Sequence, residues 1–400
     1  MLTWGEELDR VDIHNYKRRL ELTIRNVKEA STCDENKRLI LKFGDHCLAE
    51  GLSLPRVEHL LRLLKVLAEM LGKSFEEADK DDIIQLFKRL RSRKLSEWTL
   101  HDYSVAIRKF FQWLKNTRNP PEVAWLRIKT PKNKMLPEEL LTEAEIKRML
   151  KFADHPRDKA FLSVLFESGC RIGEILNLRI KHVQFEQNYA RLIVYGKTGK
   201  RMVPILFSAP ILAEWVNNHP NRDDPESVLW PKKTKPKEAM DYAIARKLLI
   251  TIARKAGLKK RVNPYTFRHS RATILAKKLP EAVLSEIFGW VQGSRMPAIY
   301  VHLSGRDTVS ALLEAYGLKT TEKEETVLKP VECWRCRNLN DPTAQVCIKC
   351  GAPLDVKKVL EQEQQRRKEI EELRNELNAL KVLILGIRGA RGLQDVEQLS

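Results

Sequence analysis

The chain has 400 residues, 43% of them hydrophobic and 31% charged, which is the composition of an ordinary soluble protein with two or three domains. Its net charge of +19 favours a polyanionic partner such as nucleic acid, because lysine and arginine release counterions from phosphates; general solubility and an acidic membrane face are the alternatives. No apolar run is long enough to span a bilayer, and the acidic first residues exclude a signal peptide, so an intracellular, cytoplasmic protein is expected.

Residues 1–117 carry apolar side chains at spacings of three and four, with lysine and arginine on the polar faces. This pattern predicts a compact domain of four or five helices whose apolar residues form its core. Residues 118–140 break the pattern, since they hold several prolines among basic side chains. We therefore expect an extended basic linker there.

A second domain is expected over residues 141–318, with Thr142 as the N-cap of its first helix. Its pattern is mainly helical with one small hairpin, so the overall fold class is mainly α with a small β-sheet (α+β). The hairpin presents Lys197 at its turn. The expected strands are residues 190–195 and 202–206, and the expected helices are residues 158–167, a helix after Arg171, and residues 210–218, 238–256, 266–278 and 281–288.

Residues 319–332 are polar and predict a second linker, which leads into a cysteine module at residues 333–354. The module has two CxxC pairs separated by ten residues, the spacing of a zinc ribbon. Four thiolates fill a tetrahedral site, so the Zn²⁺ would be structural. A redox pair of CxxC motifs is the alternative, but no thioredoxin-like context surrounds them. The four ligands would be Cys333, Cys336, Cys347 and Cys350.

Residues 355–390 contain a heptad pattern that predicts a coiled-coil helix. Such a helix would either oligomerise or cover the ribbon of its own chain, and the ribbon itself would contact either DNA or another protein. The apolar positions are Ile370, Leu373, Leu377, Leu380, Ile384 and Ile387.

Three separated segments of the second domain hold residues suited to chemistry. Each has a plainer interpretation when taken singly: an arginine three residues before a glutamate can be a surface ion pair, and a tyrosine can be part of the core. The hairpin sequence GKTGK lacks the spacing of a phosphate-binding P-loop. The residues in question are Arg171 and Glu174, then Arg268 and His269, then Trp290 and Tyr300.

Taken in chain order, these segments resemble the tyrosine recombinase, or phage integrase, family over about residues 136–303. Members of that family have an arginine after a small-residue turn, a lysine in a β-hairpin, a second arginine in a His-x-x-Arg-His stretch, a Gly-His or Gly-Trp pair, and then the nucleophilic tyrosine. The matching positions are Arg171, Lys197, Arg268 with His269, Gly289 with Trp290, and Tyr300 in the run YVHLS. That ending is similar to archaeal members.

The resemblance implies site-specific DNA recombination, for integration, excision or resolution, through a 3′-phosphotyrosine at Tyr300 and without metal or ATP. Arg171 and Arg268 would bind the nonbridging oxygens, and Lys197 would protonate the leaving 5′ oxygen. Trp290 and His269 would complete the phosphate pocket.

The same resemblance implies how the chain acts on its substrate. The first domain would clasp double-stranded DNA, and the protein would assemble as a tetramer on paired DNA sites. No membrane partner is implied.

One position departs from the family pattern, because Tyr265 stands where the family commonly has the histidine assigned to proton transfer. A phenol, with a reference pKa of about 10, is a poor base. Tyr265 would still support the phosphate by hydrogen bonding.

Two alternatives follow from this departure and from the shared chemistry. One is a DNA-binding or regulatory protein of the same fold with impaired catalysis, which Tyr265 favours. The other is a type IB topoisomerase-like enzyme, which relaxes DNA without pairing sites.

Overall fold

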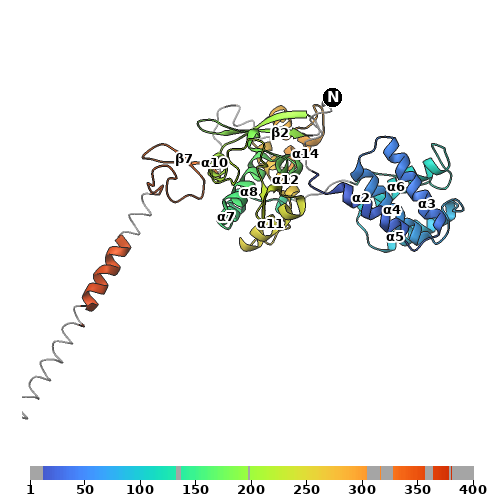
Figure 1. The fold of residues 1–400 in the computed structure, drawn as a ribbon, viewed down its shortest axis with the longest axis horizontal. Coiled ribbons are helices and arrows are strands. Elements are labelled where there is room, and N and C mark those ends of the chain that lie inside the picture. Colours follow the sequence, from blue (N-terminus) through green and yellow to red (C-terminus); the bar gives the residue numbers. More distant parts are fainter. Residues whose placement is uncertain are drawn as a thin grey trace, which may run out of the picture. The chain divides into compact units, whose positions relative to one another are not determined.

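The computed structural model describes residues 12–131, 137–196, 199–303, 316, 328–355, 364–377 and 380 (Figure 1). The chain divides into two compact units, the first made of residues 1–137 with 240–243 and the second of the remainder. As predicted, the described elements are mainly helices, with small antiparallel sheets. None of the helices in these ranges has the length and apolarity needed to cross a membrane.

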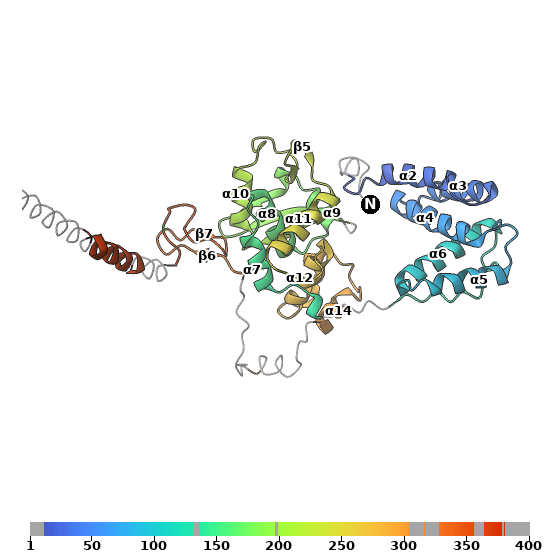
Figure 2. The same ribbon diagram turned by 90° about the horizontal axis from the view of Figure 1, so that it is seen from below.

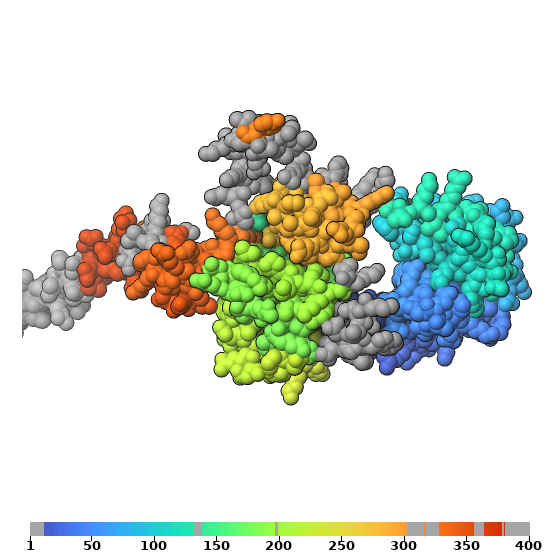
Figure 3. Space-filling model, turned by 90° about the horizontal axis from the view of Figure 1, so that it is seen from above, coloured from blue at the N-terminus to red at the C-terminus, as the bar shows by residue number. Residues whose placement is uncertain are grey.

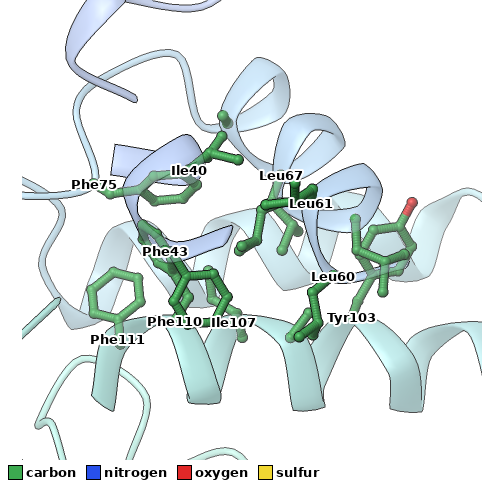
Figure 4. Close-up of a cluster of buried hydrophobic side chains, with 14 of the residues drawn as sticks. Ile40, Phe43, Leu60, Leu61, Leu67, Phe75, Tyr103, Ile107, Phe110 and Phe111 are labelled. Carbon is green, nitrogen blue, oxygen red and sulfur yellow. The ribbon is translucent and has the colours of Figure 1, made fainter. Parts of the chain in front are cut away.

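The first unit is built from five described helices that pack around one apolar core. In Figure 4, rings and aliphatic side chains from three of these helices and Phe75 meet in its centre, with Phe43 and Phe110 in edge-to-face contact at 5.3 Å. The helices are α2 (Tyr16–Lys28), α3 (Asp34–Ala49), α4 (Leu54–Leu71), α5 (Lys80–Ser92) and α6 (Glu97–Leu114).

The segment that follows α6 differs in part from the expected linker. Val123 and Leu126 are buried in the core of the first unit, and the Arg108 side chain donates hydrogen bonds to both of their carbonyl oxygens. Residues 120–126 therefore fold back onto the helices, because the two apolar side chains are buried in the core of the first unit.

In the second unit, residues 138–303 hold eight described α-helices, a three-stranded sheet and a short hairpin. Figure 2 shows α8, α11 and α12 in the middle of this unit. The helices are α7 (Glu143–Lys151), α8 (Pro156–Ser168), α9 (Ile172–Leu176), α10 (Ala209–Asn217), α11 (Tyr242–Lys255), α12 (Pro264–Ala276), α13 (Glu281–Phe288) and α14 (Met296–Leu303). The three-stranded sheet is β1 (Val183–Phe185), β2 (Ala190–Gly196) and β3 (Gly199–Ile205), in that order.

The sheet follows its apolar alternation. Leu192 and Val194 of β2 are buried on the inner face, and Leu192 pairs with the buried Val203 of β3 in an antiparallel register. Strand β3 contacts α13. Figure 3 shows green and orange parts of this unit, from its middle and late residues, adjoining on one face.

The structure corrects the expected helix at residues 238–256. This stretch begins in a hairpin of β4 (Pro231–Lys232) and β5 (Lys235–Ala239), and α11 starts only at Tyr242. Strand β5 could not be predicted from the sequence, because its residues are mostly exposed lysine, proline and glutamate, without an alternating apolar face.

A buried carboxylate fixes the junction between β3 and α10. Glu167 of α8 accepts hydrogen bonds from the backbone N–H groups of Leu206, Phe207 and Ser208 at 2.8–3.1 Å. Glu167 thereby fixes the turn that precedes α10, and it ties the hairpin to the helix that leads into Arg171.

Candidate active site

Arg171 is positioned by the break between α8 and α9. The break occurs at Gly169, whose φ of 57° lies in the left-handed region, and a Cβ there would lie 2.4 Å from Phe288 Cε1. Glycine is thus required both by the turn and by the close approach of α13. Arg171 follows as the N-cap residue of α9, with its side chain 39% exposed.

Glu174 holds Arg171, as the spacing predicted. Its carboxylate accepts the Arg171 backbone N–H at 2.9 Å and Nη1 at 3.0 Å. It also accepts two hydrogen bonds from Arg201 of β3, at 3.1 and 2.7 Å. Burial by itself would raise the pKa of Glu174, but the hydrogen bonds and charge of Arg201 outweigh it and hold that pKa below its ordinary value.

Arg201 joins three segments of the site and was not identified from the sequence. Its Nε donates to the Ile287 carbonyl oxygen at 3.0 Å, while its guanidinium pairs with Glu174. A Cβ at Gly196 or at Gly289 would lie 2.9 or 2.7 Å from Arg201 Nη1, so both glycines make room for it. Its inward place in the alternation of β3, opposite Val194, is the signal that could have revealed it.

Arg268 is buried on α12, with 4% of its surface exposed. Its Nη1 donates to the Gly169 carbonyl oxygen and its Nη2 to the Phe288 carbonyl oxygen, both at 2.9 Å. Burial and, second, the positive charge of Arg171 lower the pKa of Arg268. A bound anion would offset this unfavourable effect on the charged form of Arg268.

His269 and Tyr300 are in direct contact inside the unit. The Tyr300 hydroxyl lies 2.6 Å from His269 Nδ1, and the two residues are 1% and 8% exposed. Burial raises the pKa of Tyr300 to about 12, although the charges of Arg268 and Arg171 act in the opposite direction. Burial, and then the charge of Arg268, lowers the pKa of His269 to about 4. The phenol is therefore protonated and the imidazole neutral near pH 7.

Aromatic rings surround this pair. Trp290 stacks on Tyr300 with centroids 5.1 Å apart and an interplanar angle of 6°. Phe288 in turn stacks on Trp290, with centroids 4.9 Å apart. Tyr265 is 64% exposed, and its ring lies 4.7 Å from that of His269. The structure thus brings Arg171, Glu174, Arg268, His269, Trp290 and Tyr300 into one linked cluster, with Tyr265 at its surface.

Lys197 lies outside the described residues. The strands that flank it end at Gly196 and Gly199, which are paired across the hairpin. Its placement at the site remains a prediction.

The four cysteines of residues 333–354 come together as the spacing predicted. Their sulfur atoms all lie within 4.8 Å of one another, with Cys336 and Cys347 at 3.5 Å and Cys333 and Cys350 at 3.7 Å. Four thiolates at 2.3 Å from a tetrahedral Zn²⁺ would be about 3.8 Å apart, so the donor set fits zinc. Each CxxC turn is followed by a left-handed residue, Arg337 or Gly351.

We expect purified protein to contain about one zinc per chain, and chelation to unfold residues 333–354 while residues 138–303 stay folded. Metal analysis together with Trp334 fluorescence would measure both. Cys33→Ser, at an exposed cysteine outside the cluster, is the control and should keep the zinc. Disulfides among the four cysteines in freshly lysed cells would contradict the site.

The expected heptad helix is described in part, as a helix over residues 364–377 together with Leu380. Ile370, Leu373 and Leu377 are 42%, 63% and 53% exposed, so this part of the seam lacks a cover within the described residues. Ile384 and Ile387 lie outside them.

Leu373→Asp combined with Leu377→Asp is expected to lower the mass of any DNA-free oligomer, because the charges would sit in the apolar seam. Sedimentation over a range of concentrations would measure this. The matched control is Glu372→Gln with Glu376→Gln, two exposed polar positions on the same helix. Equal masses for wild type and the leucine variant at every concentration would show that the seam does not mediate self-association.

Comparison with known proteins gives a consistent family. The chain matches the phage integrase family over residues 139–306 and the phage integrase N-terminal SAM-like domain over residues 57–118. It is 29% identical over 258 residues to the tyrosine recombinase XerA of Pyrococcus horikoshii, covering 64% of this chain and 85% of the relative.

Two solved structures share the fold. One is the XerH site-specific recombinase bound to a palindromic difH substrate, with a TM-score of 0.54 and 18% identity over 76% of this chain and 96% of that one. The other is a lambda integrase tetramer bound to a Holliday junction, with a TM-score of 0.55 and 11% identity over 68% and 78% of the two chains.

Proposed function

Because this chain belongs to the phage integrase family of tyrosine recombinases, we propose that it performs site-specific DNA recombination with Tyr300 as its nucleophile. The observation that carries the residue assignment is the 2.6 Å contact between the Tyr300 hydroxyl and His269, which directly follows the buried Arg268 on α12. The charges of Arg268 and Arg171 both act on that hydroxyl. A phenol beside two cations is suited to attack on a phosphodiester, since the cations stabilise the charge that develops on the phosphate.

The roles of the individual residues follow from their contacts. Arg268, oriented by two carbonyl oxygens, and Arg171, held by Glu174, would each bind nonbridging oxygens. Lys197 would protonate the leaving 5′ oxygen. Trp290 holds the Tyr300 ring by stacking and would complete the phosphate pocket, and Tyr265 would support the phosphate from the surface.

The product of cleavage would be a 3′-phosphotyrosine, which keeps the energy of the phosphodiester bond. A DNA 5′-hydroxyl then reverses the step on the partner strand, so the reaction would need neither ATP nor a metal ion. The Zn²⁺ at the four C-terminal cysteines would be structural. We place the protein in the cytoplasm, as a tetramer on paired double-stranded DNA sites, and the lambda integrase tetramer supports that assembly.

The test is covalent trapping on the target DNA. A nicked target that loses its 5′ fragment after cleavage should accumulate a protein–DNA adduct in EDTA, and peptide mapping should place the adduct on Tyr300. A strict requirement for Mg²⁺, or an adduct on another residue, would refute the proposal.

The topoisomerase-like alternative is separated by a second assay. A recombinase should exchange strands between two copies of its target site. A topoisomerase-like enzyme should remove supercoils even from a plasmid that lacks the target site. The catalytically impaired alternative predicts specific DNA binding without any adduct.

A further inference from the structure

The position Tyr265 leaves the reaction without an evident base, and the structure offers another residue for that role. His269 follows Arg268 directly on α12, so the arginine that would bind the phosphate and the imidazole are carried by one helical turn. The imidazole contacts the nucleophile itself, at 2.6 Å between Nδ1 and the Tyr300 hydroxyl. Tyr265 is instead exposed, and its ring lies beside the imidazole ring, with centroids 4.7 Å apart and a tilt of 54°.

We propose that His269 accepts the proton of the Tyr300 hydroxyl through Nδ1 during DNA cleavage, an assignment that rests on the proposed function. The Tyr300 O–H bond breaks as the bond from its oxygen to phosphorus forms, and the proton moves to Nδ1. The bond from phosphorus to the 5′ oxygen breaks, and a separate acid protonates that oxygen. In rejoining, the His269 imidazolium returns the proton to the phenolate as it leaves.

The proposed role requires one of the two neutral tautomers of His269. An imidazole that accepts at Nδ1 carries its own proton on Nε2, and Nε2 is buried without a hydrogen-bond partner among the described residues. The two ring nitrogens of an imidazole point away from each other, so Nε2 cannot reach the phosphorus that Tyr300 attacks. His269 therefore serves the nucleophile through Nδ1 and does not bind the same phosphate through its other nitrogen, as its place in the phosphate pocket would have required.

The electrostatics of the site make this base dependent on the substrate. The charge that faces His269 is that of Arg268, which opposes protonation of the imidazole in the DNA-free protein; Tyr265 and Tyr300 are the other titratable groups in contact with its ring. A phosphate anion bound by Arg268 offsets that positive charge. Proton transfer is consequently favoured when DNA fills the site.

The test compares two versions of the nicked target DNA, one with the normal 5′ bridging oxygen at the scissile phosphate and one with sulfur in its place. A thiolate leaves without being protonated, so sulfur restores a variant that lacks the general acid and does not restore one that lacks the base. We expect His269→Gln to lower the single-turnover rate of adduct formation about 10²–10⁴-fold on both DNAs, with DNA affinity retained. Lys197→Ala should form the adduct slowly on the DNA with the bridging oxygen and at a restored rate on the DNA with the bridging sulfur.

The matched control is His219→Gln, the same substitution at another buried histidine of this unit, whose ring hydrogen-bonds to backbone groups of residues 221 and 228 and packs against the Trp215 ring. It should keep the wild-type rate. Should His269→Gln prove unfolded, His269→Ala leaves a space for free imidazole, which is expected to raise its rate without affecting wild type.

Three results would overturn the assignment. The first is that the sulfur-containing DNA restores the rate of adduct formation in His269→Gln, and the second is that His269→Gln reacts at the wild-type rate on the oxygen-containing DNA. The third is that Tyr265→Phe lowers the rate of adduct formation more than His269→Gln does. Failure of the proposed function can be distinguished from failure of the His269 assignment. If the proposed function is wrong, the wild-type protein itself forms no adduct on its target site.

Discussion

Tyr300→Phe is expected to eliminate the covalent adduct on the target DNA while DNA affinity stays within about twofold of wild type, because the lysine and arginine contacts that supply affinity are retained. Only one oxygen is removed, and the phenyl ring can keep its stack on Trp290. The substitution leaves His269 Nδ1 without its partner, which costs about 1–3 kcal/mol of stability. Gel separation of the denatured adduct and a binding titration on the same DNA measure the two effects.

Tyr316→Phe is the matched control, since Tyr316 also follows Trp290 in the sequence but is 79% exposed. It should form the adduct at the wild-type rate. An adduct that persists in Tyr300→Phe on the true target would show that another residue is the nucleophile.

Arg201→Ala should destabilise the catalytic unit by about 3–5 kcal/mol, because it removes the main partner of a buried carboxylate. The Glu174 and Arg201 side chains are only 4% and 10% exposed, and Glu174 would keep only the partly exposed Arg171. Arg171 would in turn be drawn to the unpaired carboxylate, so adduct formation should fall as well. Urea unfolding monitored by tryptophan fluorescence measures the stability change.

The pH dependence of this change has a definite sign. The pKa of Glu174 lies below its ordinary value in the folded protein, so its contribution to stability is complete above the unfolded pKa and is lost as pH falls. The difference in the free energy of unfolding between wild type and Arg201→Ala should therefore become smaller as the pH is lowered.

Arg191→Ala is the control for Arg201→Ala on the neighbouring strand. Arg191 pairs with Glu186 at 3.4 Å, but both side chains are about 40% exposed, so the loss should be below about 1 kcal/mol. Equal losses for the two variants would contradict the importance of the buried pair.

Local patterns allowed much of the fold to be predicted. The start of α7 at Thr142 and the hairpin of β2 and β3 follow from a capping box and from apolar alternation, which act over a few residues. The pairing of Glu174 with Arg171 is likewise a contact within one turn. The order of the separated segments then indicated the family, which the comparisons confirm.

The features that escaped prediction depend on contacts between distant residues. Arg201 meets Glu174 across 27 positions, and Tyr300 meets His269 across 31, so no local spacing specifies either contact. The burial of Val123 and Leu126 similarly depends on a core that is assembled from helices far along the chain. For β5, the exposed residues carried no periodic signal at all.

The 1% exposure of Tyr300 has a consequence for a protein with a charge of +19. Such a chain binds phosphates of any sequence, and unrelated genomic DNA outnumbers a target by many orders of magnitude. In the DNA-free protein the Tyr300 ring stacks on Trp290 and its hydroxyl contacts His269, so the nucleophile is covered by its own neighbours. We therefore expect fidelity to be separated from affinity: unrelated DNA would be bound without being nicked, and cutting would need contacts that only the target site supplies.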